Sequence, residues 1–476
     1  MTFLVANNLP RRAFLKRLGA VSAMGAAAPL ALNLAAVGDA AAFTSTDYKA
    51  LVCVFLYGGN DHPNTLVPYD LANYDRYSAI RNGGVGRTAG GIAFGRNELT
   101  ATALSPLVGQ TLTDNLQYAL APNLGGLKSL WNSGKLAVQL NVGPLVVPLT
   151  LAQYNSDNRV LYPLPPRLFS HNDQQSVWQA LGAEGASVGW AGRMGDLALA
   201  GNNGSAFTSI SAGGNAVLMS GNDVLQYQVS PNGPSPVWSA LYDRYSGALK
   251  SSTLRSLITR PSSNFLENEY AIVTKRALDL QQTVSNALNA VVLNTPFDVD
   301  GRPNSLADQL KIVARLIGAR NTLGLKRQVF FVQLGGFDQH DNLMVDHGLR
   351  MQLLNEGLVQ FQLAMGELGV ANQVTTFTAS DFGRTLSSNG NGSDHGWGGH
   401  HFVLDGAVQG GRFFGTAPKV SVTSDDQVGQ GRLLPSTSVD QFAATLARWF
   451  GVSATEMPGI FPNVGNFATA NLGFMQ

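Results

Sequence analysis

Four short, uninterrupted apolar runs constrain the fold of this 476-residue chain more than any other feature. Strands that are covered on both faces read as continuous apolar runs, whereas half-exposed strands alternate between apolar and polar residues. The runs are residues 50–57 (ALVCVFLY), 136–142 (LAVQLNV), 328–334 (QVFFVQL) and 373–379 (QVTTFTA). We therefore expect four buried strands that belong to a mainly parallel sheet.

Helical patterns lie between and after these runs. Apolar residues recur at helical spacing over 263–290, 306–323 and 343–368. A capping-box pattern, SVDQ, begins at Ser438, and Gly451 is placed to end that helix. The alternation of strands and helices predicts an α/β fold, a three-layer α/β/α sandwich around the parallel sheet.

Composition narrows the class of protein. The 32 basic and 31 acidic residues nearly cancel, which argues against a nucleic-acid partner. Cys53 is the only cysteine, so no intrachain disulfide can form, and its place in an apolar run predicts a buried thiol. Residues 182–261 are rich in turn formers, and we interpret them as a loop-rich excursion from one domain that spans 43–476.

The first 42 residues have the order of parts found in a bacterial twin-arginine export signal. Arg11 and Arg12 precede a weakly hydrophobic stretch, and small residues at 40–42 offer a cleavage site. This predicts a periplasmic or secreted protein that meets the twin-arginine translocase during export. A permanent anchor is the alternative, disfavoured by Gly25 and Pro29 within the stretch. Later segments lack the roughly 18 apolar residues of a membrane span, so we expect none after signal removal.

Two of the predicted strands end in the same pattern. FLYGGND supplies Asp61 and VQLGGFD supplies Asp338, while a third strand continues into SDFGRT with Asp381 and Arg384. Ligands of open α/β sheets bind outside the carboxyl ends of the strands, and paired glycines allow a sharp turn there. The aspartates are candidate metal ligands, although each can instead bond the backbone of its own turn or, for Asp381, pair with Arg384.

Histidines gather near the same positions. His340 follows Asp338 by two residues, His171 lies in FSHNDQQ, and SDHGWGGHH holds His395, His400 and His401. We expect His340, His395 and His400 to join the aspartates as metal ligands. His400 and His401 point to opposite sides of an extended segment, so both are not expected to reach one ion. Asp394 can orient His395 or bind directly, and His62 is more simply a loop residue.

Mixed carboxylate and imidazole ligands suit a divalent ion, zinc or manganese before calcium or magnesium. One or two ions would fit the number of candidate ligands, and a pair would bind an oxyanion from both sides. Ser170 lies at an expected helix start and is either a nucleophile, with His171 beside it, or only the helix cap. Arg384 would hold a non-bridging oxygen of a small anionic ester.

Seven motifs together resemble one family, the bacterial family of unknown function numbered 1501, whose members typically carry twin-arginine signals. The motifs are GGNDHPNTLVPY, FSHNDQQ, GGFDQHDN, SDFGRT, SDHGWGGHHFV, GAVQGGRFFG and VDQFAATLARWFGV, spread over nearly all of the chain from Tyr48 to Phe474. That family is usually placed near the alkaline phosphatase and sulfatase superfamily. The resemblance implies an alkaline-phosphatase-like sandwich with a two-metal hydrolytic centre at the strand ends.

Carried over by residue, the resemblance assigns metal-binding roles to Asp61, to Asp338 with His340, and to Asp381. His395 or His400 would supply the late histidine. Phe382 stands where a histidine would follow Asp381, which puts the second ion in doubt. The cysteine signature of formylglycine sulfatases is absent.

Two functions are compatible with these patterns. The first is an exported metal-dependent hydrolase of phosphate or sulfate esters, in which Ser170 or an activated water attacks. The second is a non-catalytic exported binding or assembly protein that keeps an enzyme-like fold and uses the excursion at 182–261 as its partner surface. Fold alone does not decide between them.

Overall fold

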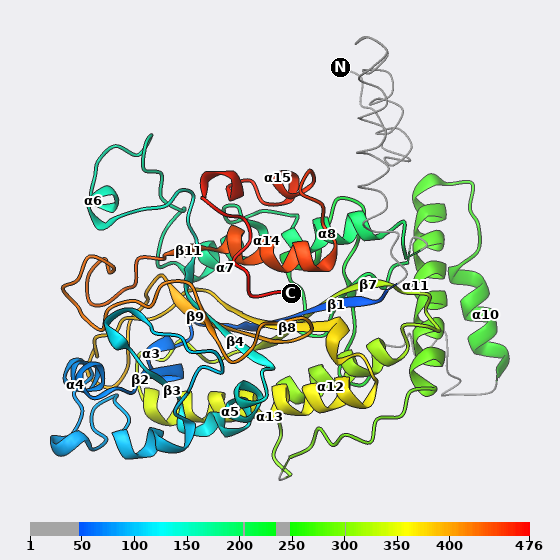
Figure 1. Cartoon of the computed structure of the whole chain (residues 1–476). Coiled ribbons are helices and arrows are strands. Elements are labelled where there is room, and N and C mark those ends of the chain that lie inside the picture. The colour runs from blue at the N-terminus through cyan, green and yellow to red at the C-terminus, as the bar shows by residue number, and fades with distance from the viewer. Residues whose placement is uncertain (1–46, 203–204, 235–247, 300) are drawn as a thin grey trace.

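A computed structural model describes residues 47–202, 205–234, 248–299 and 301–476 (Figure 1). The predicted export signal, residues 1–42, lies outside the described residues. The described strands are β1 Lys49–Leu56, β2 Leu66–Pro68, β3 Tyr118–Leu120, β4 Leu136–Gly143, β5 Ser209–Ser211, β6 Tyr227–Gln228, β7 Arg327–Leu334, β8 Val374–Ser380, β9 Gly399–Asp405, β10 Phe413–Phe414 and β11 Thr437–Ser438. The four predicted strands are confirmed as β1, β4, β7 and β8.

Nine of these strands form one sheet, in the order β10-β4-β9-β8-β1-β7-β5-β6 with β11 also pairing with β4. β1 pairs in parallel with β7 on one side and with β8 on the other, in unbroken register. Only β9 runs antiparallel to its neighbours within the described sheet. The sheet is therefore mainly parallel, as predicted, and β2 and β3 form a separate antiparallel pair.

Helices cover both faces of the sheet (Figure 1). The described α-helices are α3 His62–Thr65, α4 Leu71–Ile80, α5 Gly125–Asn132, α6 Leu151–Tyr154, α7 His171–Ala180, α8 Trp190–Ala198, α10 Ala248–Ile258, α11 Phe265–Asn289, α12 Ser305–Gly318, α13 Leu343–Glu367, α14 Val439–Phe450 and α15 Met457–Ile460. The three long predicted helices are confirmed as α11, α12 and α13. No helix of the described residues has the length and apolar character needed to cross a membrane.

The predicted start and end of α14 are confirmed in detail. The Ser438 hydroxyl accepts a hydrogen bond from the Gln441 backbone N–H at 3.0 Å, and the Gln441 side chain accepts one from the Ser438 N–H at 3.1 Å. Gly451 follows the helix with a φ of 122°, a conformation that suits glycine. This reciprocal cap satisfies two backbone donors at the first turn.

Each face of the sheet has its own apolar core because side chains alternate along a strand. In β1, Val52 and Val54 pack with α12 and α13, whereas Cys53 and Phe55 pack with α8 and α14. Cys53 is buried, as predicted. Two cores, one on each side of a buried sheet, complete the predicted three-layer α/β/α sandwich, and the fold class is confirmed.

The described part of the predicted excursion at 182–261 is built into the sandwich. β5 pairs with β7 and carries β6 at the edge of the main sheet. α8 contributes Met194 and Ala198 to one of the two cores. The two strands were not recognisable in the sequence because β5 and β6 are only three and two residues long and lie among turn-forming residues.

Asp405 gives a testable consequence for stability. It ends β9 with a φ of 55°, its Oδ2 atom is buried without a hydrogen-bond partner, and burial raises the pKa of its carboxyl group to about 6. A raised pKa means that the folded state disfavours the carboxylate. The contribution of this group to stability is therefore fully present below its unfolded pKa of about 3.9 and is lost as the pH rises through about 6.

We therefore expect Asp405→Asn to stabilise the protein by about 1–2 kcal/mol at pH 7.5, since an uncharged amide tolerates both burial and this backbone conformation. The gain should disappear near pH 3, where Asp405 is protonated in both states. Urea unfolding at the two pH values measures this. The control is Asp114→Asn, the same change at an exposed residue with a φ of 56°. Equal gains at both pH values would contradict the assignment.

Candidate metal centre

Three neighbouring parallel strands end at one edge of the sheet and bring their following residues together. β7, β1 and β8 lead into Asp338, Asp61 and Asp381, respectively. Gly58 and Gly59 turn there with φ values of 114° and 83°. A Cβ atom on Gly58 would lie 2.3 Å from the Asp338 nitrogen, and one on Gly59 would lie 2.4 Å from the Phe382 ring. The glycine pair is required for this close approach.

His171, Asp338 and His395 form a compact cluster at this edge. Each offers one ligand atom, and these atoms all lie within 4.8 Å of one another. The His171 Nε2 atom is 3.5 Å from Asp338 Oδ2, and the His395 Nε2 atom is 3.3 Å from Asp338 Oδ1. Residues separated by more than 200 positions in the sequence therefore meet at this edge, and His171, which was predicted as a catalytic residue beside Ser170, stands among the candidate metal ligands.

Three different elements deliver the cluster. Asp338 follows β7, and His171 is the first residue of α7. His395 precedes β9, whose antiparallel direction starts the strand at the edge where β8 ends. The Phe382 ring packs against the rings of His171 and His395, with centroid distances of 4.8 and 4.7 Å. The Phe382 ring thus covers one side of the two imidazoles. It follows Asp381, at the position where the family resemblance would place a histidine ligand.

The Nδ1 atoms of both imidazoles are engaged by acceptors. His171 Nδ1 lies 2.7 Å from Asp381 Oδ2, and His395 Nδ1 lies 2.8 Å from the backbone oxygen of Phe169. A carbonyl oxygen accepts but cannot donate, so Nδ1 of His395 carries the proton. The same arrangement favours the Nδ1–H form of His171. Each ring then directs the Nε2 lone pair towards Asp338, as in metal sites with oriented histidines.

The two Nε2 atoms differ in their contacts, and that of His395 lies 3.0 Å from the Nε2 atom of His340. The Nε2 atom of His171 is buried and has no hydrogen-bond partner among the described residues. The Nε2 lone pair of His395 faces a carboxylate oxygen, which is unfavourable unless a cation lies between them. Imidazole nitrogen together with carboxylate oxygen suits zinc or another borderline divalent ion. The residues present therefore fit a divalent metal ion.

His340 stands beside the cluster on its exposed side. Its Nε2 atom lies 3.0 Å from Asp338 Oδ1 and 3.0 Å from His395 Nε2. Its Nδ1 atom lies 3.2 Å from Asp394 Oδ1, so Asp394 orients His340 rather than His395. His340 thus lies against Asp338 and places a further nitrogen at the open side of the cluster, while its role as a metal ligand stays a prediction.

The charges around the cluster favour an ionised carboxylate. Although burial alone would raise the pKa of Asp338, the hydrogen bond and positive charge of Arg384 lower it below the usual value. The hydrogen bond to Asp381 raises the pKa of His171, whereas burial lowers the pKa of His395. Asp338 is thus held as an anion by a neighbouring cation.

Asp381 does not face the cluster directly. Its Oδ2 atom accepts from Gln175 at 2.8 Å in addition to His171, and its Oδ1 atom accepts from the Gly58 backbone N–H at 3.2 Å. Its side chain is fully buried. The structure thus corrects the predicted role of Asp381 from metal ligand to the carboxylate that positions the His171 ligand.

Asp61 also has a partner other than a metal. Its Oδ2 atom accepts from Arg81 Nη2 at 2.7 Å, and its Oδ1 atom accepts from the Ser393 hydroxyl at 2.9 Å. Both members of the Asp61–Arg81 pair are completely buried. The structure therefore places Asp61 in an ion pair behind the cluster, contrary to its predicted ligand role.

His400 is directed away from the cluster. It lies in β9, accepts a hydrogen bond at Nδ1 from the Asn141 backbone N–H, and packs edge-on against the His62 ring at 4.9 Å. Burial lowers the pKa of His400 to about 3. His401 points to the other face, where it packs against Trp178. The predicted opposite orientation of the two histidines is confirmed, but His400 is a core residue and not the late ligand.

Two predicted catalytic residues take other roles. Arg384 is completely buried and donates through Nη1 to Asp338 Oδ1 at 3.0 Å and to the Gly58 oxygen at 3.0 Å, so it anchors Asp338 and cannot reach a substrate oxygen directly. The Ser170 hydroxyl donates to Asp173 Oδ2 at 2.8 Å instead of to a histidine. Ser170 is the N-cap residue of α7 by position, although its side chain makes no capping hydrogen bond.

Sequence reasoning missed several residues that build this centre. Arg81 belongs to none of the motifs, whereas Phe169, Gln175 and Ser393 lie within the histidine motifs FSHNDQQ and SDHGWGGHH but were given no role. A helix start at His171 places Gln175 one turn later on the same face, which was the one available signal. Ser393 and Phe169 lie more than 200 residues from their targets, and Arg81 follows Asp61 by 20 residues, so only the fold reveals these contacts.

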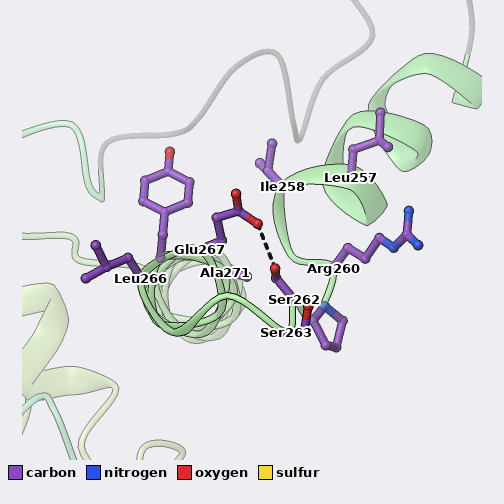
Figure 2. A pocket seen from close by; sticks show the side chains of 10 residues that line it. Leu257, Ile258, Arg260, Ser262, Ser263, Leu266, Glu267 and Ala271 are labelled. Carbon is purple, nitrogen blue, oxygen red and sulfur yellow. Dashed lines mark hydrogen bonds between the residues drawn. The ribbon is translucent and has the colours of Figure 1, made fainter.

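A large groove lies elsewhere on the molecule. It has a volume of about 680 Å³ and opens between the end of α10 and the start of α11, where Ser262 donates to Glu267 at 2.6 Å (Figure 2). Figure 1 shows these helices at the side of the molecule away from α3. The groove between α10 and α11 is lined by no histidine or aspartate, so it offers no ligands comparable to those of the cluster.

Comparisons with known proteins give a family and a set of structures. The family described as "Protein of unknown function (DUF1501)" matches residues 48–458. No curated protein matches the sequence. Similar solved structures include Ps i-CgsB in complex with k-i-k-neocarrahexaose (10% identity, 88% of this chain and 77% of that chain covered, TM-score 0.34), the PsFucS1 sulfatase from Pseudoalteromonas sp. (8%, 90% and 72%, 0.30) and a mutant of alkaline phosphatase PafA (10%, 72% and 64%, 0.26). We therefore assign roles to individual side chains from the geometry of the site and not from these comparisons.

The buried ion pair makes a prediction about stability. Arg81→Met should lower the free energy of unfolding by about 3–5 kcal/mol, because it leaves the Asp61 carboxylate buried without its cation. Removing the stranded charge in Arg81→Met/Asp61→Asn should restore part of that loss. Urea unfolding of both single variants and the double variant measures the coupling. Strictly additive losses would show that the two side chains do not depend on each other.

Proposed function

The chain belongs to the DUF1501 family, and we propose that it is an exported hydrolase of small anionic esters, phosphate or sulfate esters, that works with a divalent metal ion. The observation that carries the proposal is the convergence of His171, Asp338 and His395, with their ligand atoms all within 4.8 Å. These three residues would hold the ion. When bound, such an ion supplies Lewis-acid chemistry, which polarises an ester and acidifies water.

The protein's own side chains would do the remaining work. Asp381 holds His171, and the Phe169 carbonyl holds His395, so that both rings present Nε2 without rearrangement. Arg384 holds the carboxylate of Asp338 in place from the buried side. Fixed ligands reduce the reorganisation that accompanies binding and reaction.

Water is a better candidate for the nucleophile than Ser170. The Ser170 hydroxyl is engaged with Asp173 and has no hydrogen bond to a histidine. The His340 side chain is 45% exposed, and its Nδ1 atom is hydrogen-bonded to Asp394. Its Nε2 atom, which faces Asp338 and His395, would take a proton from an attacking water. General bases act from such positions at the open side of a site.

Export is proposed from the sequence alone. Arg11 and Arg12 with the following weakly hydrophobic stretch support passage through the twin-arginine translocase to the periplasm or the exterior. That route carries folded proteins, which suits a protein that acquires its ion before export.

We expect the purified mature protein to contain zinc or manganese at a sizeable fraction of one ion per chain. Asp338→Asn and His395→Ala should lose the ion and the hydrolysis of aryl phosphates or sulfates together, because each removes a ligand. Elemental analysis and a chromogenic substrate panel measure the two effects, with Asp114→Asn as the matched control at an exposed carboxylate.

The possible outcomes separate the two functions. Protein that binds none of the common divalent metals would exclude the metal-dependent mechanism. A bound ion with no turnover on any ester of the panel would instead favour a non-catalytic binding protein that keeps the fold.

The positioning role of Asp381 makes a separate prediction. Asp381→Asn should weaken metal affinity by about 10–100-fold, because an amide nitrogen beside His171 Nδ1 favours the wrong tautomer. Competition with a chromogenic chelator measures the dissociation constant, and circular dichroism checks that the variant is folded. Unchanged affinity in a folded variant would show that Asp381 does not orient the ligand.

A further inference from the structure

The three strand-end aspartates differ in what their carboxylates contact. Asp338 faces the imidazole cluster and is 47% exposed at its side chain, whereas the side chains of Asp61 and Asp381 are completely buried. A pair of metal ions would require carboxylates from more than one of these positions. The number of ions therefore depends on whether Asp61 and Asp381 have capacity left for a cation.

Asp61 already has a cation of its own. Arg81 donates to Asp61 Oδ2 at 2.7 Å, and its other N–H groups donate to the backbone oxygens of Ile92, Thr385 and Leu386 at 3.1 to 3.4 Å. The guanidinium is thereby fixed without contact to solvent. A metal ion bound to Asp61 would lie close to this positive charge in a buried setting, where repulsion between like charges is only weakly screened.

Asp381 is fully used by donors. Its two oxygens accept from the Gly58 N–H, from Gln175 and from His171 Nδ1. To bind an ion it would have to release His171, which is itself a member of the cluster. The same carboxylate cannot orient this ligand through Oδ2 and also serve as a ligand with that atom.

A second buried guanidinium completes the inner side of the site. Arg384 donates to Asp338 Oδ1 and, through Nε, to the Ser393 hydroxyl oxygen at 3.1 Å. That hydroxyl in turn donates to Asp61 Oδ1. A continuous chain of hydrogen bonds, Arg81–Asp61–Ser393–Arg384–Asp338, therefore runs behind the cluster.

We infer that the centre takes a single divalent ion, held by His171, Asp338 and His395, and that Arg81 and Arg384 supply the positive charge on the side where a second ion would lie. The inference rests on the proposed function, because it concerns the same site. It deepens that function by fixing the number of ions and by assigning Asp61 and Asp381 to other tasks.

The test is the metal content of the full mature chain after saturation with Mn²⁺ and removal of unbound metal. The expected result is one ion per chain and a paramagnetic resonance spectrum of isolated Mn²⁺. Two ions per chain, or a spectrum of coupled Mn²⁺ pairs, would overturn the single-ion inference while leaving a metal-dependent hydrolase intact. The absence of any bound ion would instead overturn the proposed function.

Variants locate the ion independently of activity. His171→Ala should abolish Mn²⁺ binding, whereas Asp61→Asn should keep one ion per chain. The control is Asp114→Asn. Loss of the ion in a folded Asp61→Asn protein would show that Asp61 is a ligand and would overturn the inference. If that variant does not fold, the resonance spectrum of the unaltered protein decides the question.

Discussion

The parallel pairing of β7, β1 and β8 is the constraint on which the rest of the site depends. Unbroken register across three strands makes them end together, so the residues that follow meet at one edge. β9 runs the opposite way, which brings His395 to this edge from the other direction along the chain. Because main-chain hydrogen bonds set these directions, the cluster is a product of the sheet and not of any single loop.

The two identical strand-end motifs place their aspartates next to different partners. Asp61 and Asp338 both follow two glycines and one further residue, yet Asp61 faces a buried arginine and Asp338 faces imidazoles. Burying a charge is costly unless it is paired, so the inner carboxylate required a partner within the protein. Arg384 then joins the two environments through Ser393, and the anionic form of Asp338 is a consequence of that buried cation.

The fold was largely predictable, whereas the site was predictable only in part. Apolar runs and helical spacing identified β1, β7, β8 and the long helices, because periodicity records which faces are buried. Asp338, His340 and His395 were recognisable because the ends of parallel strands must meet. The partners of Asp61 and His400 were not, since Arg81 and Asn141 are distant in sequence and carry no pattern. β9 escaped because its histidines made a buried strand resemble a polar loop.

The orientation of both imidazoles is set by acceptors that lie elsewhere in the fold. Phe169 adopts a φ of 71°, which costs a bulky residue about 1–3 kcal/mol, and its carbonyl oxygen is the acceptor for His395 Nδ1. Asp381 serves His171 in the same way from the end of β8, and Phe382 packs against both rings. Acceptors from two separate elements thus direct two nitrogen lone pairs at one carboxylate. Such an arrangement is unfavourable without a cation, and the backbone strain at Phe169 persists because the surrounding packing maintains it.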